Sequence, residues 1–245
     1  MEKFINLKAL DITQKEQYNK AVSNAFPKII SESQVIKRNW SKLENYFPEY
    51  QQFLISKDNE LIGFINALPF QFDSSLNELS DSGWDWMFSK GISDFENMIK
   101  PNYLGGLQVI VRSKFQSRGY SKRILNHAKD LFREYKLLNL VIPIRPTEKE
   151  KFPRMPMSTY LNLKTDGKVF DPWIRTHITG GAEIIKVCRE SMTMTGDISF
   201  WESILNRKII ESGKYELDGA LELISIDVAN NIGHYVEPNI WIKYN

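Results

Sequence analysis

Two apolar runs joined by an amphipathic segment constrain the fold of this chain more than any other feature. Residues 107–111 and 137–144 are short and largely aliphatic, as buried strands are. Between them, residues 121–135 carry apolar side chains at helical spacing, namely Ile124, Leu125, Ala128, Leu131, Phe132 and Tyr135. Two buried strands connected by a helix form a parallel βαβ unit, which is almost always right-handed. The sequence therefore predicts an α/β fold built around one parallel strand pair.

The segments on either side of this unit predict further elements. Before it we expect a strand at 4–12, a helix at 13–25 that Thr13 caps, and a hairpin of residues 52–56 with 61–67. After it we expect a short helix at 173–179, strands at 182–187 and 191–194, and alternating helix and strand to the end. No internal repeat or linker interrupts the 245 residues. We therefore expect a single domain, 1–245.

Composition excludes several classes of protein. The formal net charge is +2, so no bulk electrostatic attraction to nucleic acid or to a membrane surface is expected. The one cysteine, Cys188, cannot form an internal disulfide, and the first residues lack the apolar run of a signal peptide. The histidines, His127, His177 and His234, have no metal-ligand spacing. These features predict a cytoplasmic protein with no metal site, no nucleic-acid partner and no membrane partner.

The loop between the first buried strand and the helix carries the clearest chemical signal. A helix start offers free N–H groups and a partial positive charge, and Gly119 lets the backbone approach a ligand closely. The segment 112–123 has no acid and five basic residues, Arg112, Lys114, Arg118, Lys122 and Arg123. A cradle for phosphate groups has this composition. A solvated basic turn would have it too, so the loop alone leaves both readings open.

A dinucleotide-binding fold also places phosphates at a helix start. It requires the pattern G-x-G-x-x-G after the strand. Here Gly105 and Gly106 precede the strand, only Gly119 follows it, and the second strand ends at Arg145 instead of an acid. This reading is disfavoured, although a nucleotide-binding protein of another α/β fold stays as an alternative.

The same loop resembles a family motif. Gln116-Ser117-Arg118-Gly119-Tyr120-Ser121 is similar to the Q/R-x-x-G-x-G/A motif with which the GNAT superfamily of N-acetyltransferases wraps the pyrophosphate of CoA, with Ser121 in place of the last Gly or Ala. The order of elements over residues 1–195 also resembles that superfamily. Four stretches resemble a bacterial branch of it: 145–147, 170–173, Arg175-x-His177 and 235–239.

This resemblance implies a fold and a cofactor. The fold would be a mixed, mostly antiparallel sheet with a central splayed parallel strand pair and flanking helices. The cofactor would be acetyl-CoA or another acyl-CoA. Its thioester and pantetheine would meet the backbone of Val109, Ile110 and Val111, and its pyrophosphate would meet residues Gln116, Ser117, Arg118, Gly119, Tyr120 and Ser121.

The resemblance also implies direct transfer of an acyl group from the thioester to an amine of a small molecule or peptide. His177 stands where the superfamily often has a tyrosine acid, and Tyr160 is a second candidate for that role. Asp171 and Glu237 are candidate bases, and a water could serve instead. Arg145, Arg175 and Trp84 are candidate acceptor-binding residues. Each has a structural alternative: a histidine at a helix end, a helix cap, a strand-end acid, an ion pair or a core tryptophan.

Two segments exceed a minimal GNAT layout, residues 73–103 and 145–172. Connections of this length usually have a function of their own. We expect both to form the walls of the acceptor site, with outer decoration of an enlarged core as the alternative. The departure at Ser121 and the absent tyrosine keep a second function open, a non-catalytic acyl-CoA sensor. The oligomeric state stays open as well, a homodimer included.

Overall fold

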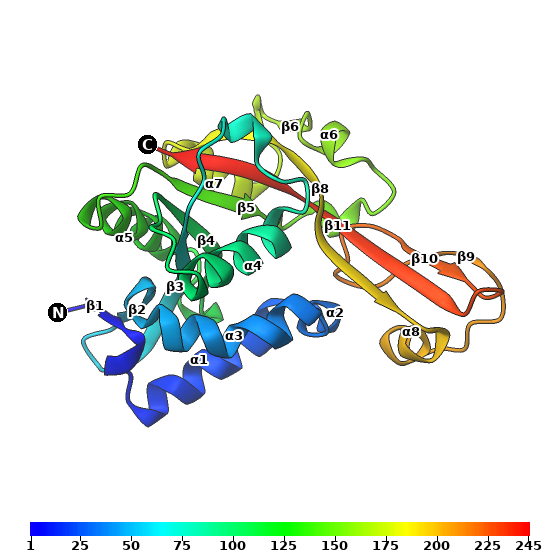
Figure 1. The fold of residues 1–245 in the computed structure, drawn as a ribbon, viewed down its shortest axis with the longest axis horizontal. Coiled ribbons are helices and arrows are strands. Elements are labelled where there is room, and N and C mark those ends of the chain that lie inside the picture. Colours follow the sequence, from blue (N-terminus) through cyan, green and yellow to red (C-terminus); the bar gives the residue numbers. More distant parts are fainter.

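A nine-stranded sheet organises the protein, and a computed structural model describes all residues from 1 to 245 (Figure 1). The strand order is β1-β2-β3-β4-β5-β11-β10-β9, with β8 paired to β11. The strands are β1 Lys3–Asn6, β2 Gln51–Ile55, β3 Leu61–Phe70, β4 Tyr103–Val111, β5 Leu140–Ile144, β8 Glu183–Gly196, β9 Gly213–Tyr215, β10 Ile224–Asp227 and β11 Ile232–Tyr244. Only β4 and β5 pair in parallel. The mostly antiparallel sheet with one central parallel pair confirms the predicted fold class.

Helices cover both faces of this sheet. They are α1 Ile12–Ala25, α2 Lys28–Ser31, α3 Gln34–Tyr46, α4 Gly83–Glu96, α5 Tyr120–Glu134, α6 Met157–Tyr160, α7 Pro172–Thr179 and α8 Ile198–Leu205; β6 Lys164–Thr165 and β7 Lys168–Val169 form a separate hairpin. None of the helices is both long and apolar enough to cross a membrane.

Packing along β3 shows which helices share a face. Phe64 meets Tyr18 of α1 edge-on, and Leu68 lies against Gly91 of α4. Gly63 points the other way, toward Ile124 of α5. Because alternate residues of a strand share a face, α1 and α4 cover one face of the sheet and α5 covers the opposite one.

The N-terminal expectations need correction. The first strand ends at Asn6 instead of residue 12, because a short 3-10 helix, η1 Leu7–Ala9, follows it. Helix α1 is capped by Asp11, not Thr13: the Asp11 side chain accepts from the Gln14 amide, and the Gln14 side chain accepts from the Asp11 amide. This reciprocal capping box satisfies amides that a helix start leaves free. The predicted hairpin of β2 and β3 is confirmed.

Helix α4 lies inside the segment that had no regular element in the sequence analysis. Its buried residues, Trp84, Met87, Phe88, Gly91 and Ile92, recur at helical spacing and face the sheet. The absence of a side chain at Gly91 is what permits close packing, since a Cβ there would stand 2.0 Å from Leu68 Cδ1. Helix α4 thereby crosses from β3 toward β8 on the face that it shares with α1.

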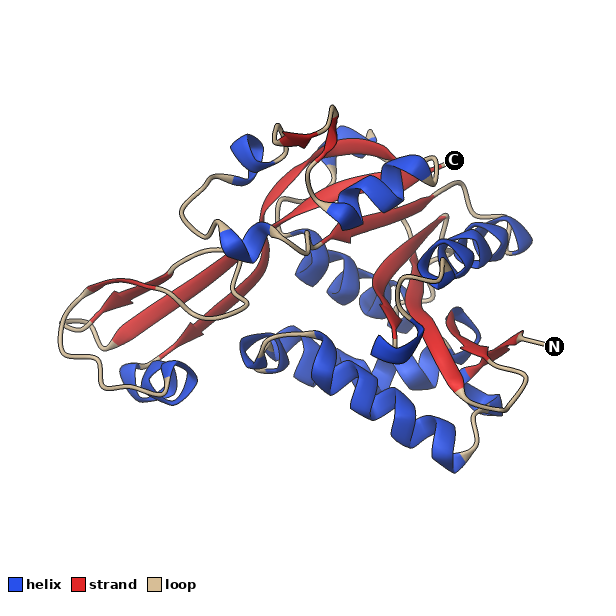
Figure 2. Cartoon of the chain, turned by 180° about the vertical axis from the view of Figure 1, so that it is seen from behind, coloured by secondary structure: helices blue, strands red, loops and turns tan.

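The two strands expected at 182–187 and 191–194 are one continuous strand, β8. It pairs with β11 over nearly its whole length, with a register shift between Glu237 and Asn239. The outer halves of both strands, together with α8, β9 and β10, form an arm (residues 191–237) that projects from the body (Figures 1 and 2). Trp201 fills the interior of the arm against Gly233.

Substituting Gly91 tests the packing of α4. Gly91→Val would force its side chain into Leu68, so the free energy of unfolding should fall by about 1–3 kcal/mol. Gly213→Val is the matched control, because the nearest atom to a Cβ at Gly213 is 4.0 Å away. Urea unfolding measures both variants. Equal stability of the two would contradict the close approach of α4 to β3.

Candidate active site

The parallel strands β4 and β5 separate soon after they begin. They pair only at Leu104 with Leu140 and at Gly105 with Val141, although β4 continues to Val111. Beyond these pairs β4 keeps β3 as its neighbour on one side and has no strand on the other. This divergence is the predicted splay.

The backbone of β4 offers donors to the splay. Arg112 N–H donates to Ile62 O at 3.0 Å, so Arg112 is one of the β4 residues whose backbone groups bond to β3. Because bonded pairs alternate in an antiparallel ladder, the polar groups of Ile110 fall on the β3 side. Those of Val109 and Val111 fall on the open side. An extended chain with amide groups could pair with these two residues as a strand would.

The loop after β4 ends at the start of α5, where the backbone amides have no hydrogen-bond acceptor in the protein. Gly119 at φ 78° and Ser117 at φ 60° are both left-handed, which turns successive amides inward to one side. The six amides from residue 117 to residue 122 donate to no protein acceptor, and the first bond of α5 runs from Arg123 N–H to Gly119 O. No side chain caps this helix, and its first turn holds no acid. The arrangement fits an anion such as a pyrophosphate.

The basic residues of this loop divide into two groups. Arg112 donates to Gln17 and to Leu61 O, Lys114 pairs with Glu60, and Arg123 pairs with Glu2. Arg118 and Lys122 form no ion pair with the protein. Their charges are therefore available to a ligand. A hollow of about 600 Å³ adjoins this loop, and it is lined by Phe115, Arg118, Tyr120, Arg123, the first two residues of the chain and residues 56–58 of the β2–β3 turn.

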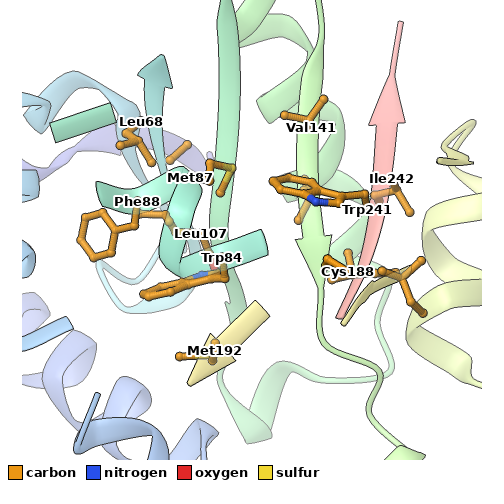
Figure 3. Packing of buried hydrophobic residues seen from close by; sticks show 14 of the residues in the cluster. Leu68, Trp84, Met87, Phe88, Leu107, Val141, Cys188, Met192, Trp241 and Ile242 are labelled. Carbon is orange, nitrogen blue, oxygen red and sulfur yellow. The ribbon is translucent and has the colours of Figure 1, made fainter. Parts of the chain in front are cut away.

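Helix α4 closes the splay on the face that it shares with α1. The Trp84 indole Nε1–H donates to Leu107 O of β4 at 2.8 Å, and the Trp84 amide donates to Ser191 Oγ of β8 at 2.8 Å. Figure 3 shows the Trp84 ring beside Leu107, with Met192 of β8 next to it. Trp84 is buried between two strands that are not neighbours in the sheet. The segment 73–103 thus reaches the splay, and its role as an acceptor-site wall stays a prediction.

Glu237 lies in a buried polar cluster at the base of the arm. Its Oε1 accepts from Arg145 Nε at 2.9 Å and its Oε2 accepts from the Tyr235 hydroxyl at 2.6 Å, while Arg145 also donates to Gly219 O. Burial and the charge of Glu237 raise the pKa of Tyr235 well above its usual value. Both Glu237 and Arg145 are therefore engaged with protein partners in this structure.

Asp171 and Tyr160 bond to each other within the segment 145–172. Asp171 Oδ1 caps α7 by accepting from the amides of Trp173 and Ile174, and Oδ2 accepts from the Glu148 amide and from the Tyr160 hydroxyl at 2.8 Å. Burial, followed by the hydrogen bond to Asp171, raises the pKa of Tyr160. These contacts hold the segment 145–172 in place.

His177 is enclosed in the core. Its Nδ1 is 2.8 Å from the Tyr244 hydroxyl, and its Nε2 has no partner. Burial lowers its pKa from 6.5 to about 3. A neutral, enclosed imidazole favours the structural alternative, and the catalytic role of His177 stays a prediction. Arg175 donates to the carbonyls of Val169 and Phe170, which also favours a structural role.

Several polar residues at the splay were not among the sequence candidates. Asp85 follows Trp84 on α4, and the Ser191 hydroxyl joins Trp84 to Asn239 of β11. Tyr235, Glu237 and Asn239 alternate along β11, a spacing of two that places strand side chains on one face. That spacing, and the family resemblance of the stretch 235–239, were the signals for Tyr235 and Asn239. Asp85 gave none, because its helix was not predicted.

Gly119 tests the cradle. Gly119→Val meets no atom within 4 Å but must hold a β-branched side chain at φ 78°, and its methyl groups would stand where phosphate approaches. We expect the Kd for CoA to rise at least about tenfold, which is ~1.4 kcal/mol. Gly167→Val is the matched control, with φ 72° and an equally open site in the β6–β7 turn. Calorimetry that finds the same CoA affinity in both variants would remove the loop from the binding site.

Because His177 is buried, we expect the free energy of unfolding to depend on pH. Its folded pKa lies below the unfolded one, so the unfolded chain binds an extra proton as pH falls below about 6.5. Stability is therefore full above that pH and declines by about 1.4 kcal/mol per pH unit toward pH 3. His177→Gln should remove this part of the slope, whereas His234→Gln, at an exposed site, should leave it. Unfolding titrations between pH 4 and 7 that give three equal slopes would contradict the buried neutral imidazole.

Comparisons with known proteins agree with this geometry. Residues 16–146, more than half of the chain, match the acetyltransferase (GNAT) family. The arginine N-acetyltransferase avaD of Aspergillus versicolor is 26% identical over 251 residues, which cover 91% of this chain and 86% of that protein.

Two solved structures share the fold over nearly the whole chain. The loading GNATL domain of CurA from Lyngbya majuscula aligns with a TM-score of 0.61 and 14% identity, covering 100% of this chain and 98% of that one. The GphF GNAT-like decarboxylase in complex with isobutyryl-CoA aligns with a TM-score of 0.57 and 10% identity, covering 99% and 98%. The splayed strand pair and the free amides at the start of α5 agree with the family match. The chain belongs to the GNAT family of acetyltransferases.

Proposed function

We propose that this protein transfers an acyl group, acetyl in the simplest case, from CoA directly to an amine of a small acceptor. The observation that carries the proposal is the run of six free amides at the start of α5, which leads directly to the open edge of β4. A pyrophosphate on those amides would let the pantetheine arm continue along β4. The thioester would then enter the splay.

Different residues of the chain would hold the phosphates and the pantetheine arm of acyl-CoA. Arg118 and Lys122 would neutralise phosphate charge, and the amides of residues 117–122 would orient it. Val109 and Val111 would pair with the amides of pantetheine as a neighbouring strand does. Such pairing fixes the thioester in one place, which is the main requirement when transfer is direct.

The acceptor would meet the thioester beside the first turn of α4, which lines the splay on the face opposite α5. Trp84 supplies aromatic surface there, and the carboxylates of Asp85 and Glu237 are the acidic groups beside it. An acidic surrounding suits a cationic amine. The relationship to an arginine N-acetyltransferase over 91% of this chain supports arginine as the first acceptor to test. Its α-amine is the expected nucleophile, because a guanidinium group keeps its proton in water.

An acceptor panel tests the proposal. With acetyl-CoA we expect L-arginine to release free CoA thiol and to gain one acetyl group on its α-amine. Nα-acetylarginine should be inert, and agmatine, which lacks the carboxylate, should react more slowly if that group orients the acceptor. Thiol release and mass spectrometry measure both products, and propionyl-CoA and isobutyryl-CoA compare acyl length. Tight CoA binding without thiol release for any amine would contradict transferase activity.

A further inference from the structure

Asp85 occupies the first turn of α4, directly beside the residue that closes the splay. Trp84 holds this turn to β4 through Leu107 O and to β8 through Ser191. The Asp85 carboxylate faces β8, where its Oδ2 accepts from the Thr193 amide at 3.0 Å. Its position is therefore fixed by bonds on both sides of the splay, on the face from which an acceptor would enter.

The second carboxylate oxygen is unusual. Oδ1 of Asp85 is enclosed and has no hydrogen-bond partner, although the residue as a whole is partly exposed. A buried acceptor without a donor destabilises the folded state, and in native proteins such a group calls for an explanation. The bond from Thr193 does not explain the acid, since an asparagine would accept it equally well. An ammonium group of a bound acceptor would supply the donor that Oδ1 lacks.

The charges around Asp85 favour proton uptake. Strands β3, β4 and β5 present no acidic or basic side chain, and on β8 Lys186 is paired with Asp81, Arg189 and Glu190 are exposed, and Cys188 is buried. On α3, Lys42 pairs with Glu96 and Glu44 accepts from the Trp40 indole. The charge that raises the pKa of Asp85 comes from Glu237 of β11. Glu237 itself is bonded to Arg145.

We propose that Asp85 is the general base that takes the proton from the acceptor's ammonium group, a role that rests on the proposed acyl transfer. The carboxylate accepts one proton from R–NH₃⁺, and the neutral amine attacks the thioester carbon. The C–N bond forms, the C–S bond breaks, and CoA leaves as a thiolate that takes up the proton lost from the attacking nitrogen. The proton on Asp85 then passes to solvent, so the net release is one proton.

The other candidate bases are less suited to this step. Asp171 accepts four hydrogen bonds and Glu237 is bonded to Arg145 and Tyr235, so neither has a free oxygen. The pKa of Asp85 also suits a general base. Burial raises this pKa from 3.8 to about 6, and the charge of Glu237 adds to the rise. The basic form therefore predominates above pH 6, and catalysis should fall as pH drops through that value.

Asp85→Asn tests the role while keeping an oxygen for the Thr193 amide. With acetyl-CoA and the best acceptor of the panel, kcat/KM should fall by about 10²–10⁴-fold, the usual contribution of a general base. The Kd for CoA should be unchanged, because the cradle lies on α5. Asp81→Asn is the matched control, an acid near the same helix start that pairs with Lys186, and it should keep full activity.

The pH profile separates a base from a positioning residue. The parent should lose kcat/KM below about pH 6 with a slope of one proton, and Asp85→Asn should lack that limb. A parent that turns over while Asp85→Asn keeps its rate, or keeps the acidic limb at a lower rate, overturns the role of Asp85 and leaves the transferase standing. A parent that turns over no amine overturns both.

Discussion

The splay between β4 and β5 depends on one extra residue in β4. Gln108 pairs with Asn66 and Gly106 pairs with Ala67, so Leu107 has no partner on β3 and forms a bulge. A bulge bends its strand and increases the local twist, which turns β4 away from β5 directly after their two shared pairs. The carbonyl freed at Leu107 would be costly to bury alone, and the Trp84 indole satisfies it. The opening is thus held by a hydrogen bond as well as by the divergence of the strands.

The same turn of α4 connects the body to the arm. Gly83, at φ 30°, lies so close to β8 that a Cβ would stand 2.3 Å from Ser191 Oγ, and this proximity lets Ser191 bond both the Trp84 amide and Asn239. At the base of the arm, the pair of Glu237 and Arg145 lies at the stretch of β11 that neither β5 nor β10 covers. Removing one partner of that pair would leave an uncompensated buried charge. The arm therefore fixes the α4 side of the splay through polar contacts.

The sequence predicted the parts of this protein that local patterns specify. The crossover of β4, α5 and β5 followed from apolar periodicity and was placed within a few residues. The glycine and the basic residues located the loop at the helix start, and its role as a phosphate site stays a prediction. The helix α4 was missed although its apolar side chains recur at helical spacing, because Gly83 and Gly91 weaken that pattern as a helix signal. Tyr160 and Asp171 were named as catalytic candidates by position, whereas the structure bonds them to each other. Which polar side chains satisfy one another is decided by tertiary contacts.

The two faces of the sheet provide the two electrostatic environments that acyl transfer requires. On the α5 side, Arg118 and Lys122 have no acidic partners, and cations there would lower the pKa of any nearby carboxyl and make it a poor base. On the α4 side, the carboxylate charge of Glu237 acts in the opposite direction and raises the pKa of Asp85. The proposed base and the proposed phosphate site would thus lie on opposite sides of the sheet, where neighbouring charges shift a carboxyl pKa in opposite directions.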